Sequence, residues 1–539
     1  MKFQNPILRG FNPDPSLCRV GKDYYIATST FEWFPGVQIH HSRTLDDWEL
    51  VARPLDRAAQ LDMRGNPDGC GVWAPALSYA DGLFWLVYTN VRRYDGNYKD
   101  TPNFLVTAPS IDGPWSDPVY LNASGFDPSL FHDDGGRKWL VNMVWNHRAT
   151  MKERDAPKDF FGGIMLQEYD PKAQKLVGPA TNIFHRSPLG FTEAPHLMKR
   201  NGYYYLITAE GGTGRHHAVT HARSRHIAGP YEMHPDTHVL TAKDTPDAPL
   251  QRVGHGQPCD GPEDGTLLHS FLCSRPLNGQ FSTMGRESGL AVLEWRDDGW
   301  AYRCGDGVAP DVSVGGAGAP APEDDTTPFA PGPLPQPFQW LRSPEPERLF
   351  STEARPGWLR LFGRESIGSW FEQALVARRQ TEHFCSAEVT LEFTPSDFQH
   401  QAGLVAYYGR YQFHYLYVTK DDNGTRRLNI QACQGDWPEA HLTYPIGEGR
   451  AIDDGPIRLG LDIENGALTF RYAFAGTWQS IGSTLDASLL SDEAGRGEHA
   501  NFTGCFLGMA AQDITGHGHP ADFADFTYRA DARYWAQGG

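Results

Sequence analysis

Asp14-Pro15-Ser16-Leu17, followed by a turn and the aromatic-rich stretch Asp23-Tyr-Tyr-Ile-Ala-Thr28, is a combination that recurs along the first half of the chain. A period of strands and turns, without helical stripes, predicts the blades of a β-propeller when it is this long. The prolines of the related segments lie 53 to 67 residues apart. The five segments are Asp14-Pro-Ser-Leu, Trp73-Ala-Pro-Ala-Leu, Asp127-Pro-Ser-Leu, Glu193-Ala-Pro-His-Leu and the weaker His255-Gly-Gln-Pro-Cys.

Three of these segments start with a carboxylate: Asp14, Asp127 and Glu193. Equivalent positions of propeller blades converge on the central channel, so we expect the three groups to lie together. One position differs, because Asp14 and Asp127 directly precede their prolines whereas Glu193 lies two residues before its own. Successive strand residues point to opposite faces, so Glu193 reaches the channel only if a bulge or its longer side chain compensates.

The chain is expected to contain two domains and a connection, since 539 residues exceed one ordinary domain. Residues 1–308 hold the repeats and predict a five-bladed propeller. Residues 309–338 are rich in Pro and Gly, which preclude regular secondary structure, and predict a linker or surface strap. Residues 339–539 show alternating apolar positions, as in Ala387–Phe393 and Ile457–Ile463, and predict a β-sandwich. The expected fold class is all-β.

Composition limits the partners and the location. The 66 acidic and 48 basic residues give a net charge of −18, which argues against nucleic acid or an anionic membrane as the main partner. The N-terminal stretch lacks the apolar region of an export signal, and no membrane-spanning stretch is found. The eight cysteines, without any Cys-x-x-Cys, predict reduced and mostly buried thiols in a cytoplasmic protein.

Three carboxylates in one site permit acid and base chemistry, because a shared site pushes their pKa values apart. Glycoside hydrolysis needs one carboxylic acid to protonate the leaving oxygen and one carboxylate to activate water or attack carbon. A single Asp before Pro commonly just starts a turn. The recurrence of an acidic residue at one repeat position favours a functional site over that alternative.

Several motifs taken together resemble glycoside hydrolase family 43. The stretch Thr28–Ser42 resembles the β-xylosidase branch in particular. The C-terminal half, including Phe502-Thr-Gly and Asp513-Ile-Thr-Gly, is similar to the concanavalin-like sandwich of that branch, so the resemblance covers essentially the whole chain. The motifs are Asn12-Pro-Asp14-Pro-Ser, Trp73-Ala-Pro, Gly125-Phe-Asp127-Pro-Ser, Thr192-Glu193-Ala-Pro-His and Gly285-Arg286-Glu287.

The resemblance implies an exo-acting, inverting 1,4-β-xylosidase that acts on short xylo-oligosaccharides, with α-L-arabinofuranosidase side activity and no required cofactor. Carried over position by position, Asp14 is the general base and Glu193 the general acid. Asp127 orients the acid and, by its negative charge, raises the pKa of Glu193. Ala194 stands where many relatives have Gly, and we expect no consequence for the acid itself.

Arg286 and three aromatic residues are expected to bind the sugar. Arg286 donates hydrogen bonds to sugar hydroxyls, the alternative being a structural ion pair with Glu287 or Asp127. The candidate aromatic walls, whose faces stack on the C–H faces of pyranose rings, have core packing as their alternative. These walls are Phe31, Trp73 and Trp145.

Phe502 and His255 complete the candidate site. In the resembling enzymes a sandwich loop closes one side of the pocket, and Phe502 fits the aromatic of such a loop, with an ordinary core position as the alternative. In those enzymes a matching His also faces the channel and can ligate a calcium ion or water. The resemblance therefore implies a metal-ligating role for His255 and a structural calcium ion in the channel, although a lone His is commonly structural and no zinc spacing is present.

Other functions remain open at this stage. An arabinofuranosidase or arabinanase of the same fold differs only in pocket shape. A non-catalytic carbohydrate-binding protein is disfavoured because all three carboxylates are present. A fructosidase would carry Arg-Asp-Pro and Glu-Cys motifs, whereas Asp127 follows Phe126 and Glu193 precedes Ala194.

The sandwich itself could bind polysaccharide, or shape the pocket and mediate assembly. The second role is favoured because xylan does not enter cells whereas short oligosaccharides can. Relatives are often dimers or tetramers, so a homo-oligomer is expected.

Overall fold

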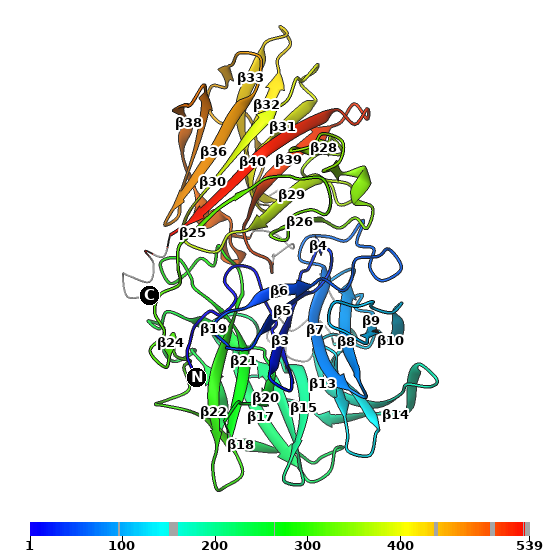
Figure 1. The fold of residues 1–539 in the computed structure, drawn as a ribbon. Helices are drawn as coiled ribbons and strands as arrows, with labels where there is room; N and C mark the ends of the chain where they lie inside the picture. The colour runs from blue at the N-terminus through cyan, green and yellow to red at the C-terminus, as the bar shows by residue number, and fades with distance from the viewer. Residues whose placement is uncertain are drawn as a thin grey trace.

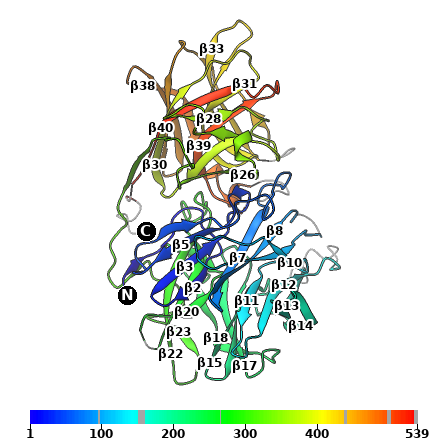
Figure 2. The same cartoon turned by 45° about the vertical axis from the view of Figure 1, so that its right-hand side comes forward.

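Two all-β domains form the structure, a computed structural model that describes residues 1–94, 98–149, 160–263, 265–435, 440–495, 502–531 and 533. The propeller lies below in Figure 1, coloured blue to green, and the sandwich lies above it, coloured green to red. The turned view of Figure 2 likewise places the sandwich against one side of the propeller. The predicted all-β class, with a five-bladed propeller followed by a sandwich, is confirmed.

The propeller contains one sheet for each repeat segment, and strands that follow one another in sequence are neighbours in each sheet. The first blade contains β2 (Ser16–Val20), β3 (Asp23–Thr28), β5 (Gln38–Ser42) and β6 (Glu49–Ala52). The second contains β7 (Gly71–Ala80), β8 (Leu83–Val91), β9 (Asn103–Ala108) and β10 (Val119–Asn122). The third contains β11 (Ser129–His132), β12 (Lys138–Trp145), β13 (Phe161–Asp170) and β14 (Lys175–Phe184).

The last two blades follow the same antiparallel order. The fourth contains β15 (Glu193–Arg200), β16 (Tyr203–Glu210), β17 (Ala218–Ser224) and β18 (Glu232–Thr241). The fifth contains β19 (Gln251–Gly254), β21 (Thr266–Ser274), β22 (Glu287–Trp295) and β23 (Ala301–Arg303), with β20 (Pro258–Asp260) also paired to β21. The ring closes where the first and fifth blades meet, and there the Ser270 hydroxyl donates a 2.7 Å hydrogen bond to the Pro15 carbonyl.

The connection between the domains is partly regular, which corrects the expectation of no secondary structure over residues 309–338. Strand β24 (Ser313–Val314) pairs with β1 (Phe3–Gln4), so the connection first ties down the N-terminus. Strand β25 (Glu323–Thr327) pairs with β40 of the sandwich over five residues. The Pro and Gly residues flank these short stretches rather than fill them, and pairing with an existing strand edge is enough to order each one.

Two sheets form the sandwich. The first runs in the order β27 (Phe350–Ser351), β28 (Leu359–Phe362), β40 (Pro520–Ala530), β30 (Phe384–Glu392), β36 (Ile457–Glu464), β37 (Ala467–Phe474) and β38 (Thr477–Asp486). The second runs in the order β34 (Leu442–Thr443), β33 (Arg426–Gln434), β32 (Gln412–Lys420), β31 (His400–Gly409), β39 (Phe506–Asp513), β29 (Ala374–Arg379) and β26 (Phe338–Leu341), with β35 (Arg450–Ala451) paired to β33. The described 3₁₀ helices are η2 (Pro346–Arg348), η3 (Ala487–Leu489) and η4 (Asp492–Ala494).

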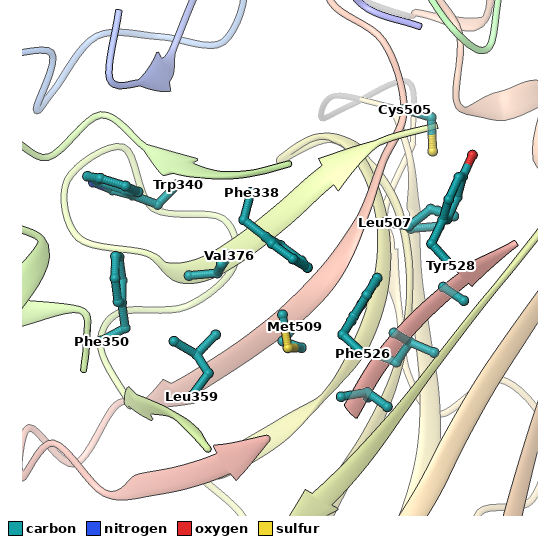
Figure 3. Close-up of a cluster of buried hydrophobic side chains, with 14 of the residues drawn as sticks. Phe338, Trp340, Phe350, Leu359, Val376, Cys505, Leu507, Met509, Phe526 and Tyr528 are labelled. Carbon is teal, nitrogen blue, oxygen red and sulfur yellow. The ribbon is translucent and has the colours of Figure 1, made fainter. Parts of the chain in front are cut away.

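The sandwich core lies between these sheets, and the alternating pattern of the sequence explains it. Ala387, Val389 and Leu391 of β30 are fully buried, and the apolar positions of β36 are buried in the same way. Figure 3 shows the aromatic and aliphatic side chains that meet inside, among them Phe338 and Phe526. Their rings pack edge to face, with centroids 5.2 Å apart.

The two domains share a sheet, because β4 (Trp33–Phe34) of the propeller pairs with β26 and extends the second sandwich sheet by one strand. The Trp33 ring stacks on Phe506 of the sandwich at a centroid distance of 3.7 Å. Arg275 joins the domains by charge, since its guanidinium contacts Glu287 of the propeller and Glu382 of the sandwich, each at 2.8 Å. All three side chains are buried, so the junction is a packed and ion-paired interface.

None of the eight cysteines forms a disulfide bond, and six of them are buried. Among the described residues, none of the helices has the length and apolar character needed to span a membrane.

Candidate active site

One cavity of about 260 Å³ brings all nine predicted site residues together. It lies where the repeat segments converge, so every blade contributes a wall residue. The sandwich contributes one side chain as well. The predicted residues that line the cavity are Asp14, Phe31, Trp73, Asp127, Trp145, Glu193, His255, Arg286 and Phe502.

A larger cavity, of about 410 Å³, lies on the sandwich. Its walls hold glutamines and aromatic rings, including Gln401, Gln431 and Tyr444, but no Asp or Glu side chain. Hydrolysis of a glycoside needs carboxyl groups, so the smaller cavity in the propeller is the candidate active site.

A shared backbone conformation at the start of the blades resolves the offset of Glu193. The residue that directly precedes the proline has a positive φ in four segments: 58° at Asp14, 37° at Ala74, 54° at Asp127 and 52° at Ala194. The pairing register of the fourth blade also shifts between Glu193 and His196, as in a bulge. The bulge lets Glu193 line the same cavity as the two Asp residues, although it lies one position earlier.

Asp14 is buried and held by positive and polar partners. One carboxylate oxygen accepts a 3.2 Å hydrogen bond from Arg286 and the other accepts a 2.6 Å hydrogen bond from the Ser29 hydroxyl. The Nδ1 atom of His255 lies 3.6 Å from the first oxygen. Burial on its own raises the pKa of Asp14, but Arg286, His255 and Ser29 together lower it below the ordinary value. Asp14 is therefore ionised at neutral pH, as a base requires.

Glu193 has the opposite environment. Burial is the main cause that raises its pKa well above the ordinary value, and the charges of Asp127 and Asp14 add to it. Burial and the charge of Asp14 also raise the pKa of Asp127 to about 8, against a 3.0 Å hydrogen bond that the Ala194 amide donates to Asp127. Because three like charges cannot ionise together in one buried site, Asp14 loses its proton at neutral pH while Glu193 and most of Asp127 keep theirs.

Arg286 pairs with the proposed base, not with Glu287 or Asp127 as the structural alternative supposed. Its Nη1 contacts Asp14 and its Nη2 donates a 2.9 Å hydrogen bond to the Phe502 carbonyl. The buried Nε atom has no hydrogen-bond partner among the described residues. A donor is thus left at the cavity for a hydroxyl group of a ligand.

Aromatic rings surround the carboxylates and leave little of the cavity without an apolar wall. Trp73 lies at the centre, with ring centroids 5.7 Å from Phe31, 5.5 Å from Phe126 and 5.9 Å from Phe502. Trp73 is fixed by the 2.8 Å hydrogen bond that its Nε1 donates to the Gly69 carbonyl. The Trp145 ring lies further along the same wall, 6.3 Å from Phe126.

Phe502 is a wall residue and not part of the sandwich core. It belongs to the segment that precedes β39, and its ring lies 5.5 Å from Tyr94 of the propeller as well as against Trp73. The same side of the sandwich is anchored on the propeller through Asp492 and Glu493, which contact Arg252. The second domain therefore closes the candidate active site.

Sequence reasoning missed several cavity residues. Phe126 precedes Asp127 and could have been found from its repeat position, but no repeat marks Tyr94 or Lys99 between β8 and β9. The Lys99 ammonium group donates to the Tyr94 carbonyl and lies 4.4 Å from the centre of the Trp145 ring. The missed residues that line the cavity are Tyr94, Lys99, Phe126, Phe161, Phe191, Gly212 and Thr213.

His255 lines the cavity beside Asp14, and burial is the main cause that lowers its pKa. Calcium takes about six to eight oxygen ligands. Within the described ranges, no group of three or more His, Cys, Asp or Glu side chains is arranged to hold a metal ion. The calcium ion implied near His255 therefore stays a prediction.

Comparison with known proteins agrees with the fold and the carboxylate site. Residues 3–301 match the family model "Glycosyl hydrolases family 43", and residues 326–529 match the "Beta xylosidase C-terminal Concanavalin A-like domain". The chain is 55% identical to a xylosidase/arabinosidase of Humicola insolens, with 98% of each chain covered. It is 45% identical to a beta-xylosidase of Bacillus subtilis, with 98% of this chain and 100% of the relative covered.

A solved structure is similar over the same length. The xylan beta-1,4-xylosidase from Bacillus halodurans C-125 superposes with a TM-score of 0.91 at 44% identity, covering 98% of this chain and 100% of that one. The propeller and its buried carboxyl groups, closed by a concanavalin-like sandwich, are those of a glycoside hydrolase, and the protein is an enzyme of this class. It belongs to glycosyl hydrolase family 43, with the C-terminal domain of the beta-xylosidases of that family.

Proposed function

We propose that the enzyme is an exo-acting, inverting 1,4-β-xylosidase that releases xylose from the non-reducing end of short xylo-oligosaccharides. The observation that carries this proposal is a small cavity with one ionised and one protonated carboxyl group, closed on one side by the sandwich. The names of the relatives, xylosidase or xylosidase/arabinosidase, support the sugar class.

The chemistry follows from the two protonation states. Glu193 donates its proton to the glycosidic oxygen as the bond to the leaving group breaks. Asp14 removes a proton from a water molecule that attacks the anomeric carbon from the opposite face, which inverts the configuration. Asp127 raises the pKa of Glu193 through the charge that it gains as it ionises, with a pKa of about 8, and Arg286 holds Asp14 in place while its Nε donates to a sugar hydroxyl.

The size of the cavity supports exo-action. Pockets for drug-sized ligands have volumes of roughly 300–1,000 Å³, so about 260 Å³ suits a ligand of one or two sugar rings. Phe502 and Trp73 close the wall that an internal segment of a polymer would have to cross. The terminal sugar of a chain can enter such a pocket, whereas a long chain cannot lie through it.

Two substrates with different leaving groups distinguish the roles of Asp14 and Glu193. Each change to alanine is expected to lower kcat on xylobiose by about 10²–10⁴-fold. On nitrophenyl xyloside, whose leaving group needs little protonation, the Glu193→Ala variant should recover much of its rate and the Asp14→Ala variant none. Asp117→Ala, at an exposed ion pair, is the control. Retained hydrolysis of xylobiose by either variant would contradict the assignment.

Inversion is tested by observing the anomer that is released first. ¹H NMR of xylobiose hydrolysis should show α-xylose before mutarotation. An initial β-xylose signal would mean retention, with the carboxyl groups roughly 5–5.5 Å apart instead of 6.5–9.5 Å.

A second activity, on α-L-arabinofuranosides, is proposed because one relative is named xylosidase/arabinosidase. Comparison of kcat/KM on nitrophenyl xyloside and nitrophenyl arabinofuranoside measures it, and a higher value on the arabinofuranoside would make arabinofuranosidase the main function. Xylobiose with 1,3 in place of 1,4 linkage tests the linkage in the same assay.

We also propose that the enzyme acts in the cytoplasm as a dimer or tetramer. The eight cysteines, none of them in a disulfide bond and six of them buried, support a reducing compartment. Light scattering of the purified protein measures the assembly, and a monomer would contradict it.

A further inference from the structure

A separate cavity of about 240 Å³ lies at the junction of the two domains, and arginines from both of them line it. Arg9 and Arg53 belong to the propeller, whereas Arg378 and Arg379 end β29 of the sandwich. No Asp or Glu side chain is part of this wall. The cavity shares no wall residue with the candidate active site.

Two of these arginines form ion pairs with glutamates that lie outside the cavity wall. Arg9 lies 2.7 Å from Glu382, and Arg378 lies 2.9 Å from Glu323. Their charges are therefore accounted for by the protein itself.

The other two, Arg53 and Arg379, have no carboxylate within 4.0 Å in the part of the chain that the structure describes. Arg53 donates hydrogen bonds of 2.8 Å to the Gln38 side chain and to the Gln336 carbonyl. Arg379 donates to the Phe11 carbonyl at 2.5 Å and to the Gln339 side chain at 2.7 Å. All of these acceptors are neutral, so two cations share one cavity without a counter-charge.

Three polar atoms of the wall residues are also without a hydrogen-bond partner among the described residues. They are Nε of Arg378, Nη2 of Arg379 and Nδ1 of His40, in residues that are only 7%, 8% and 9% exposed. A buried donor that lacks an acceptor destabilises a folded protein, and an isolated buried charge does so more strongly. The cavity therefore presents unused donors and uncompensated positive charge together.

The acid–base properties of these groups agree with an excess of positive charge. Burial lowers the pKa of Arg53 to about 9, and burial together with the charge of Arg53 lowers the pKa of Arg379 well below its ordinary value. Burial and the two arginines lower the pKa of His40 to about 3, so its ring is neutral at pH 7. A neutral imidazole still has one N–H group to donate.

We propose that this cavity is a binding site for a small oxyanion, held by Arg53, Arg379 and His40 between the two domains. Guanidinium groups match the oxygens of a phosphate or a carboxylate, which accept two hydrogen bonds side by side. The exposed Gln336 and Pro337 form the rim, so an anion from solution reaches the site.

Such an anion would hold the two domains together at their junction. Arg53 and His40 lie on the first blade and Arg379 lies on a sandwich strand, so one ligand joins both domains. Arg379 also binds the carbonyl of Phe11, whose ring lies 5.6 Å from the active-site ring of Phe31. The site is independent of the identity of the sugar substrate.

Calorimetric titration of the full-length enzyme tests the site, first with inorganic phosphate and then with glucuronate, at constant ionic strength in a chloride buffer. We expect saturable binding of one anion per chain and a rise in Tm with its concentration. Phosphate alone, glucuronate alone or both would identify the oxyanion chemistry that the site accepts. Absence of saturable binding of either anion at millimolar concentration would overturn the proposal.

Two variants locate the binding. Arg53→Met and Arg379→Met should each weaken the anion at least tenfold, whereas Arg57→Met, at an exposed arginine paired with Asp117, should bind like the parent. In the absence of phosphate, Arg53→Met should be at least as stable as the parent, because it removes a partly buried charge that has no carboxylate partner among the described residues. If Arg379→Met fails to fold, Arg53→Met still decides the matter. Equal affinity in the parent and the variants would place the anion elsewhere and overturn the proposal.

Discussion

At the scale of single residues, the pH dependence of the enzyme depends on Asp127. The charge of Asp127 is one cause of the raised pKa of Glu193, whereas Asp127, with its own pKa raised to about 8, is uncharged in the acidic range where Asp14 titrates. In Asp127→Asn the pKa of Glu193 therefore falls, so the alkaline limb of kcat/KM should move to lower pH. The acidic limb, set by the ionisation of Asp14, should stay in place. A pH profile on xylobiose measures both limbs, and an unmoved alkaline limb would contradict the coupling.

Ala194 is a second residue with a measurable consequence. Its φ of 52° lies in the left-handed region, where a side chain with a Cβ atom is strained by roughly 1–2 kcal/mol. Glycine does not carry that strain but loses more freedom on folding. We expect Ala194→Gly to stabilise the fold by a net amount of about 1 kcal/mol, measured as a rise in Tm. The matched control is Ala209→Gly, on β16 beside Glu193, which should destabilise it.

At the scale of elements, the segment that leads into β39 matters most, because it brings a sandwich side chain to a propeller site. Phe502→Ala removes the ring that packs on Trp73 and Tyr94 but keeps the backbone carbonyl that accepts from Arg286. We expect kcat/KM on xylobiose to fall about tenfold, which is about 1.4 kcal/mol of transition-state stabilisation. Tm should change little, since the ring is only partly buried.

The control for Phe502 is Phe398→Ala. Phe398 is an exposed phenylalanine on the wall of the sandwich cavity of about 410 Å³, which contains no Asp or Glu side chain. Its loss should leave kcat/KM unchanged. Equal activity of both variants would show that the sandwich does not shape the substrate pocket.

At the scale of the whole molecule, the two domains are expected to unfold together, because the buried Arg275 contacts a carboxylate in each. Arg275→Met removes the buried ion pairs with Glu287 and Glu382, and should destabilise the protein by about 3–5 kcal/mol. Arg57→Met, at an exposed pair, should cost less than ~1 kcal/mol. Calorimetry of the parent should show one unfolding transition. Two transitions in the Arg275→Met variant would mean that Arg275 couples the unfolding of the two domains.

The sequence predicted the five blades and the three carboxylates because both recur at a fixed place in a repeat. It left the offset of Glu193 open, since the bulge depends on φ angles at Ala194 that no residue type dictates. Lys99 and Tyr94 were missed because they lie in a connection without a repeat. The strand pairing of β4 with β26 was also missed, because its partners are separated by about 300 residues.

Short-range periodicity and repetition in the sequence encode the all-β class, the blade number and the sandwich, and they point to the candidate residues for acid–base chemistry. Only the tertiary structure decided which carboxyl group is ionised, that Phe502 closes the pocket, and that Arg53 and Arg379 share a cavity without a counter-charge. The physical reason is that pKa values, pocket walls and charge compensation depend on burial and on distances between residues far apart in the chain. The recurring Asp-Pro-Ser-Leu segment thus specifies the propeller, and the packing of the two domains around it specifies the candidate active site.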